Sequence, residues 1–155
     1  PEIMFIAKED LPYDADLQTI ILNTEIAAGI EIPEARYKDW FPNFTLGDLI
    51  CDDTATGLIV VGNKVDPLDI DAFAHVQLNL YKDEELIATG DTSEVLGNPL
   101  NAVLWLIKKL HSHGKQIKKG QVISSGTFIS PLKLEYGTYR AEYSGIGTVE
   151  FKVSK

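Results

Sequence analysis

The 155 residues have the composition of one globular domain, with 45% hydrophobic and 24% charged residues and no internal repeat or linker. Fourteen Lys and Arg against 23 Asp and Glu leave a net charge of −9, which argues against a nucleic-acid partner, because phosphate binding needs a basic surface. No apolar run approaches the roughly 20 residues of a membrane span, and the lone Cys51 cannot form a disulfide within the chain, so we expect a cytoplasmic protein without a membrane partner.

The N-terminal part of the chain is predicted to hold three strands and one short helix. Alternating hydrophobic residues predict a strand at 2–7, and Asp14 or Asp16 is placed to cap a short helix after it. The period changes to two over 25–32, where every second residue is apolar and would face a core. A short apolar run at 58–61 predicts another buried strand.

The C-terminal part is predicted to hold a hairpin, the strongest helix and more strands. Residues 73–81 and 85–89 are typical of a hairpin. A helix is expected from Asn98 to Gly114, because a capping residue precedes a proline and apolar residues recur at spacings of three and four. Further strands are expected at 121–124, 138–143 and 148–153. Together these elements predict an α+β fold dominated by β-structure.

Two glutamates stand out as candidate ligands of a cation. Alternation places Glu2 on the same face of its strand as Met4 and Ile6, an apolar setting in which a carboxylate needs a partner. Glu31 ends its strand on the face that also carries Gly29, whose lack of a side chain leaves room for a ligand. The alternative is that both are solvated acids at strand ends, as most surface carboxylates are.

Two polar loops are candidates for binding a substrate. Residues 52–57 combine adjacent carboxylates with two hydroxyls and could orient a water molecule, or could form a turn whose Asp side chains bind their own backbone. Residues 124–127 combine small hydroxyls with a glycine that allows close approach of the backbone. Their hydroxyl and N–H groups could hold a carboxylate, although an ordinary bulged strand end has the same composition.

Several of these motifs, in this order, resemble the 2-keto-4-pentenoate hydratase group of the fumarylacetoacetate hydrolase superfamily. The match runs nearly end to end, and the most diagnostic motif is Gly97-Asn-Pro-Leu-Asn-Ala102 ahead of the apolar helix. The other matching motifs are Pro1-Glu-Ile-Met-Phe-Ile6 followed by Asp10-Leu-Pro12, Ile30-Glu-Ile-Pro-Glu-Ala-Arg36 with Asp39-Trp40, Asp52-Asp-Thr-Ala-Thr-Gly57, Gly120-Gln-Val-Ile-Ser-Ser-Gly-Thr127 and Gly145-Ile-Gly-Thr-Val-Glu-Phe151.

The resemblance implies mixed β-sheets with flanking helices and a divalent cation, Mg²⁺ or Mn²⁺, held by three glutamates. Glu2 matches the second member of a Glu-x-Glu pair, and Glu31 matches the third ligand. The first member would stand before Pro1, so we expect residues 1–155 to be a single catalytic domain that forms the C-terminal part of a longer chain. An all-carboxylate site suits a hard divalent cation.

The resemblance also implies a lyase of aromatic catabolism that adds water to a 2-hydroxy-2,4-dienoate, a small 2-oxo or 2-hydroxy acid. The cation would bind the substrate's carboxylate and C2 oxygen and polarise its keto form. Asp52 and Thr56 are the candidates for positioning the water or moving a proton, and Thr127 for holding the substrate carboxylate. The loop departs from the family's Asp-Asn-Ala-Ser-Ser-Gly at Asp53, which adds a negative charge, and Gln121 replaces an acid common in relatives.

Other functions compete with the hydratase interpretation. A 4-oxalocrotonate decarboxylase would use the same cation, but the motif at 97–102 favours a hydratase. A hydrolase that cleaves a carbon–carbon bond of a 1,3-diketo acid is a more distant alternative. A truncated, inactive homologue that serves as a binding or assembly module is the non-enzymatic alternative. Family habit and the apolar helix predict a homo-oligomer.

Overall fold

The computed structural model describes residues 1–34, 36–39 and 43–155, and these build eight strands and three α-helices. The residues of the matched motif at positions 35 and 40 lie outside this description. The elements follow in the order β1 (Glu2–Ala7), α1 (Leu17–Leu22), β2 (Thr24–Ile32), α2 (Leu46–Cys51), β3 (Leu58–Val65), β4 (Gln77–Lys82), β5 (Glu85–Asp91), α3 (Pro99–His111), β6 (Val122–Ser124), β7 (Gly137–Tyr143) and β8 (Gly147–Val153).

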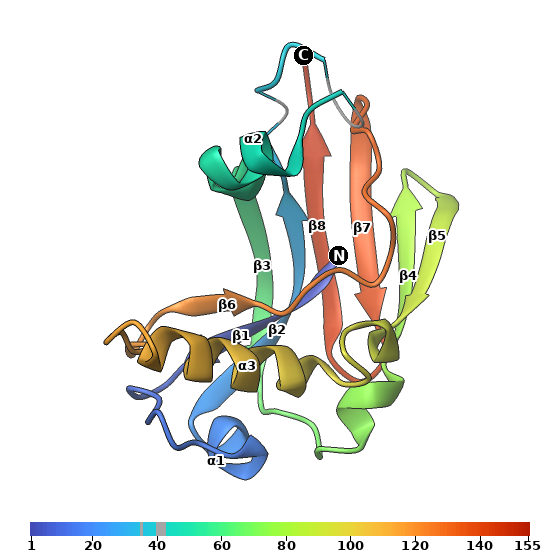
Figure 1. The fold of residues 1–155 in the computed structure, drawn as a ribbon. Coiled ribbons are helices and arrows are strands. Elements are labelled where there is room, and N and C mark those ends of the chain that lie inside the picture. Colours follow the sequence, from blue (N-terminus) through green and yellow to red (C-terminus); the bar gives the residue numbers. More distant parts are fainter. Residues whose placement is uncertain (35, 40–42) are drawn as a thin grey trace.

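The strands form two four-stranded sheets (Figure 1). The first sheet has the order β3-β2-β1-β6, and the second has the order β5-β4-β7-β8. The α+β class dominated by β-structure is therefore confirmed. Every pairing among the described strands is antiparallel, whereas the resemblance implied mixed sheets. The second sheet is built from tight hairpins, which join antiparallel neighbours.

One continuous hydrophobic core joins the two sheets and the longer helix. Alternate residues of β1 and β2 face it, and so do Leu78 and Leu80 of β4. Helix α3 contributes Leu100, Val103 and Ile107, whose spacing of three and four residues places them on one face. Its opposite face is open, since Trp105 is 60% exposed. In the described part of the chain, no helix has the length and apolar character needed to cross a membrane.

The helix ends follow the capping signals in the sequence. The Asn98 side chain accepts a hydrogen bond from the Leu100 N–H at 3.0 Å, and Pro99 occupies the first helical position, as predicted. Asp16 caps α1 in the same way. Helix α2 was not predicted, although Thr45 and Asp48 form a reciprocal capping box at its start. The sequence therefore contained a signal for the start of α2, namely the spacing of three residues between Thr45 and Asp48.

Strand β3 corrects the prediction of a short buried strand at 58–61. It continues to Val65, and its first residues lie near the surface, with Leu58 70% and Ile59 48% exposed. An apolar run alone does not distinguish a central strand from an edge strand. β3 is the edge of the first sheet, with β2 as its ladder partner on one side.

Candidate functional site

The pairing of β1 with β2 brings Glu2 and Glu31 together on one face of the first sheet. Glu2 lies opposite Gly29 in the antiparallel register, and Glu31 follows two residues later. Because side chains alternate along a strand, Glu2, Gly29 and Glu31 all point to the face away from the main core. The two glutamates are therefore diagonal neighbours, and the space over Gly29 is filled by the side chain of Met4.

Glu2 is buried and is held by the end of β6. Glu2 is only 4% exposed to solvent. Its Oε2 accepts hydrogen bonds from the Ser124 hydroxyl and from the Gly126 N–H, the latter at 2.7 Å. Hydrogen bonds donated to an ionised carboxylate are strong, and they offset the hydration that the carboxylate loses on burial. The predicted need of Glu2 for a partner is therefore met by the 124–127 loop, one of two loops considered as candidates for binding a substrate, and the carboxylate that it holds belongs to the protein itself.

The two carboxylates repel each other electrostatically. The pKa of Glu31 is raised, first because its carboxylate loses hydration, second because the charge of Glu2 lies nearby, and third because the two side chains hydrogen-bond. Glu31 is the exposed member of the pair and Glu2 the buried one. A cation between them would remove the repulsion and satisfy both acids.

The donor set fits a hard divalent cation. Carboxylate oxygens are the ligands that Mg²⁺ prefers, and Mg²⁺ is commonly bound through one or two carboxylates while it keeps several waters. Within residues 1–34, 36–39 and 43–155, no group of three His, Cys, Asp or Glu side chains could hold a metal ion. The described residues therefore offer two carboxylates to a cation at this place.

Tyr143 supports the site from the second sheet. It is 4% exposed, and its hydroxyl donates a hydrogen bond to the carbonyl oxygen of Gly29, the residue opposite Glu2 and two residues before Glu31. Burial is the main cause that raises the pKa of Tyr143 far above its ordinary value, so the hydroxyl stays protonated and acts as a donor. This contact ties β7 to the backbone that carries Glu31.

Replacing Tyr143 by phenylalanine should lower the free energy of unfolding by about 1–2 kcal/mol, because the buried carbonyl of Gly29 loses its donor. Chemical denaturation measures this change. Tyr139 offers a control, since it is equally buried in the same strand and its hydroxyl accepts a hydrogen bond from the Glu135 N–H in an exposed segment. A Tyr143→Phe variant no less stable than Tyr139→Phe would show that the contact with Gly29 contributes little.

The 52–57 loop lies at the end of β2 that carries Glu31. The Glu34 N–H donates to the carbonyl oxygen of Ala55 at 2.8 Å, and the first residues of β3 pair with the last residues of β2. Three consecutive non-glycine residues of the loop, Asp53, Thr54 and Ala55, have φ between 54° and 58°. Such left-handed conformations cost free energy and cluster at functional sites.

The side chains of this loop are engaged within the loop and with Arg36. Asp52 Oδ1 accepts from Arg36 at 3.2 Å, and Arg36 also donates to the carbonyl oxygen of Thr56. The Thr56 hydroxyl donates to the carbonyl oxygen of Asp53. The charge of Asp52 contributes, after burial, to the raised pKa of Tyr37. The loop is thus brought to the same end of the sheet as Glu31, while Asp52 and Thr56 have partners of their own.

Thr127 follows the residue whose N–H binds Glu2, but its hydroxyl is turned elsewhere. It donates to the carbonyl oxygen of Ile129 at 3.0 Å, and Thr127 is exposed. The contacts of Ser124, Gly126 and Tyr143 with the site were not predicted. Ser124 and Gly126 lay in a loop singled out by its composition, whereas no local pattern distinguishes Tyr143 from other tyrosines of the strands.

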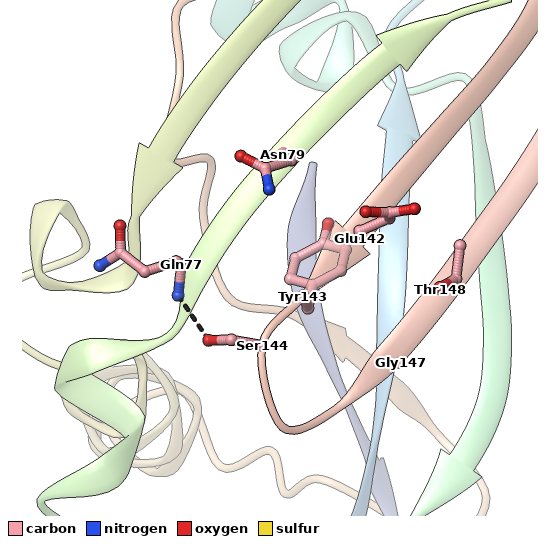
Figure 2. Close-up of a pocket in the computed structure, with 7 residues that line it drawn as sticks. All are labelled: Gln77, Asn79, Glu142, Tyr143, Ser144, Gly147 and Thr148. Carbon is pink, nitrogen blue, oxygen red and sulfur yellow. Dashed lines mark hydrogen bonds between the residues drawn. The ribbon is translucent and has the colours of Figure 1, made fainter. Parts of the chain in front are cut away.

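A shallow hollow of about 300 Å³ opens on the outer face of the second sheet (Figure 2). It is lined by polar residues of β4, β7 and β8, among them Asn79 and Glu142. The Gln77 N–H donates to the Ser144 hydroxyl at 2.9 Å, and Glu142 is paired with Arg140. Since neither candidate glutamate lines the hollow, we do not assign it to the site.

Comparison with known proteins finds relatives along nearly the whole chain. No family model matches. The chain is 32% identical over 154 residues to a 2-keto-4-pentenoate hydratase of Burkholderia vietnamiensis, covering 96% of this chain and 57% of the relative. It is 30% identical over 158 residues to a hydratase of the same name from Paraburkholderia phymatum, covering 99% of this chain and 59% of the relative. It is 32% identical over 134 residues to a 2-hydroxyhexa-2,4-dienoate hydratase of Comamonas testosteroni, covering 84% and 49%.

Solved structures show the same fold. The 4-oxalocrotonate decarboxylase of Pseudomonas putida G7, complexed with calcium and acetate, superimposes with a TM-score of 0.80 at 22% identity, over 96% of this chain and 56% of that one. A fumarylacetoacetate hydrolase family protein from Yersinia pestis superimposes with a TM-score of 0.69 at 10% identity, over 99% and 68%. The chain spans about half the length of the curated relatives it matches. By sequence and by fold, the chain belongs to the 2-keto-4-pentenoate hydratase group of the fumarylacetoacetate hydrolase superfamily.

Proposed function

We propose that the protein is a hydro-lyase that adds water to a 2-hydroxy-2,4-dienoate and produces a 4-hydroxy-2-oxo acid, with a divalent cation held by Glu2 and Glu31. The observation that carries the proposal is the pair of carboxylates placed side by side across Gly29. Relatives named as hydratases act on substrates of this kind, and the solved decarboxylase was complexed with calcium in one structure and with magnesium in another.

The residues of the pair have distinct tasks in this proposal. Glu2 is held in place by two hydrogen bonds and provides a fixed ligand, whereas Glu31 at the exposed side completes the pair. When bound, Mg²⁺ or Mn²⁺ supplies Lewis-acid polarisation of the substrate's carboxylate and C2 oxygen. The two carboxylates would hold that cation and so fix where the substrate's carboxylate and C2 oxygen could bind.

The loops supply the remaining groups. We assign to Asp52 and Thr56 the positioning of the attacking water and the movement of its proton, and to Thr127 the binding of the substrate carboxylate. The support is the location of the 52–57 loop beyond the strand that carries Glu31, together with its strained backbone. Thr127 would need to release Ile129 to bind a substrate, because its hydroxyl donates to that residue.

The same proposal includes the organisation of the protein. Residues 1–155 form a catalytic domain that is the C-terminal part of a longer chain, which assembles as a homo-oligomer in the cytoplasm. The exposed Trp105 on α3 supports the oligomer, because large aromatic side chains are enriched at subunit contacts.

The experiment is the hydration of 2-hydroxypenta-2,4-dienoate, followed by the loss of the dienoate absorbance. We expect turnover with Mg²⁺ or Mn²⁺ and its loss after chelation, restored when the cation is returned. Release of CO₂ from 4-oxalocrotonate without any hydration would instead assign a decarboxylase. Binding of Mn²⁺ without turnover of either substrate would show that residues 1–155 act as a binding module.

A further inference from the structure

The carboxylate of Glu2 is held unevenly, since both of its described hydrogen bonds go to one oxygen. The Ser124 hydroxyl and the Gly126 N–H both donate to Oε2. The Glu2 carboxylate also interacts with the carboxyl group of Glu31, and this contact helps to raise the pKa of Glu31. The end of β6 therefore anchors Oε2 of a carboxylate that faces Glu31.

The backbone at the end of β6 is shaped to supply the second donor. Gly126 has a φ of +110°, a conformation that residues with a side chain rarely adopt. An added Cβ would meet only the side chain of Val95, at 3.4 Å, so conformation rather than crowding requires glycine here. This turn directs the Gly126 N–H at the same Glu2 oxygen that the Ser124 hydroxyl binds.

We infer that Ser124 and Gly126 are positioning residues that fix Oε2 of Glu2 and so hold its carboxylate as a preoriented ligand to the cation shared with Glu31. The inference rests on the proposed cation site and extends it to residues that contact neither cation nor substrate. Ligating carboxylates are usually held by outer hydrogen bonds, and the loss of such a partner weakens metal binding by about tenfold to a hundredfold. A carboxylate free to rotate would lose orientation rather than charge.

The neighbouring Ser125 provides a matched control. It is 4% exposed, and its N–H donates to the carbonyl oxygen of Ile3, a residue of the main core. Its hydroxyl oxygen is buried without a hydrogen-bond partner among the described residues. Two adjacent serines therefore differ in one respect that matters here, because only the hydroxyl of Ser124 reaches Glu2.

The test is the binding of Mn²⁺ to the whole chain, measured by electron paramagnetic resonance of the free ion, without any assay of turnover. We expect Ser124→Ala to weaken Mn²⁺ binding about tenfold, Ser124→Thr to restore it, and Ser125→Ala to leave it unchanged. Circular dichroism at the temperature of the titration checks that each variant is folded, and Ser124→Thr carries the test if the alanine variant is not.

The outcomes separate this inference from the proposed function. If the unaltered protein binds no Mn²⁺, the proposed cation site is wrong and the assignment of Ser124 is wrong with it. If the unaltered protein binds Mn²⁺ and Ser124→Ala binds it equally well, only the positioning role is overturned. Equal weakening by Ser124→Ala and Ser125→Ala would also overturn it, because the effect would then come from general loosening of β6.

Discussion

Replacing Glu31 by glutamine is expected to make the cation-free protein more stable at neutral pH. The ionised Glu31 is unfavourable in the folded state, because its carboxylate has lost hydration and lies close to Glu2. Glutamine keeps the shape and removes the charge. Since Glu31 is exposed, screening by solvent limits the gain to about 1 kcal/mol or less, which corresponds to a rise of about 2–4 °C in melting temperature at most.

The sign of the pH dependence follows from the raised pKa of Glu31. Its contribution to stability is fully present below the pKa of an unfolded glutamate, near 4.3, and is lost as the pH rises through the higher folded value. The difference in melting temperature between Glu31→Gln and the unaltered protein should therefore be largest at neutral pH and shrink on acidification. Calorimetry in the presence of a chelator measures it.

The same variant should lose its response to cations. A ligand present at a hundred times its dissociation constant stabilises a protein by about 2.7 kcal/mol, and we expect Mn²⁺ to stabilise the unaltered protein but hardly to affect Glu31→Gln. The control is Glu34→Gln, at an exposed glutamate three residues along the chain. A less stable cation-free Glu31→Gln would contradict the repulsion, and equal stabilisation by Mn²⁺ would contradict the assignment of Glu31 as a ligand.

Replacing Gly29 by alanine is expected to destabilise the fold by about 2–3 kcal/mol, as overpacking of a well-filled site does. The added Cβ would lie 2.3 Å from Cγ and 2.6 Å from Cε of Met4, and 3.2 Å from the carbonyl oxygen of Glu2. Met4 is fully buried, so its side chain has no free space into which it could move. Unfolding in urea measures the loss.

Two further variants identify the cause. Gly47→Ala places a methyl group in α2, where the nearest atom is 3.5 Å away, and should leave the stability unchanged or raise it by up to about 1 kcal/mol. Met4→Ala is destabilising by itself but removes the atoms that clash. In that background the additional effect of Gly29→Ala should largely vanish, and additive effects would show that the contact with Met4 is not the cause.

Much of the fold could be predicted from short-range patterns. The strand at 2–7 and the helix that begins after Asn98 lie where alternation and capping placed them. Predictions failed where the outcome depended on distant partners. The run at 58–61 was taken for a buried strand, yet β3 is an edge strand whose first residues are exposed. An apolar run has the same composition in either position, and only the arrangement of neighbouring strands distinguishes the two.

The candidate site divides in the same way. Glu2 and Glu31 were singled out individually, because alternation puts each on the face of its strand that carries small or apolar neighbours. The local pattern around either glutamate does not predict the register between β1 and β2. It is this register that makes the two residues diagonal neighbours. The 124–127 loop was expected to hold a carboxylate, but that this carboxylate is Glu2 follows only from the pairing of β6 with β1.

The amino-acid sequence by itself determined the local elements, the acidic character and the resemblance to the hydratase group. These depend on residues close to one another in the chain or on their order along it. Only the tertiary structure decided that Glu2 lies beside Glu31 and is anchored by Ser124, and that Tyr143 binds the backbone of the strand that carries Glu31. Such contacts join residues far apart in the chain, and the register of hydrogen-bonded strands and the packing of one sheet on the other place them.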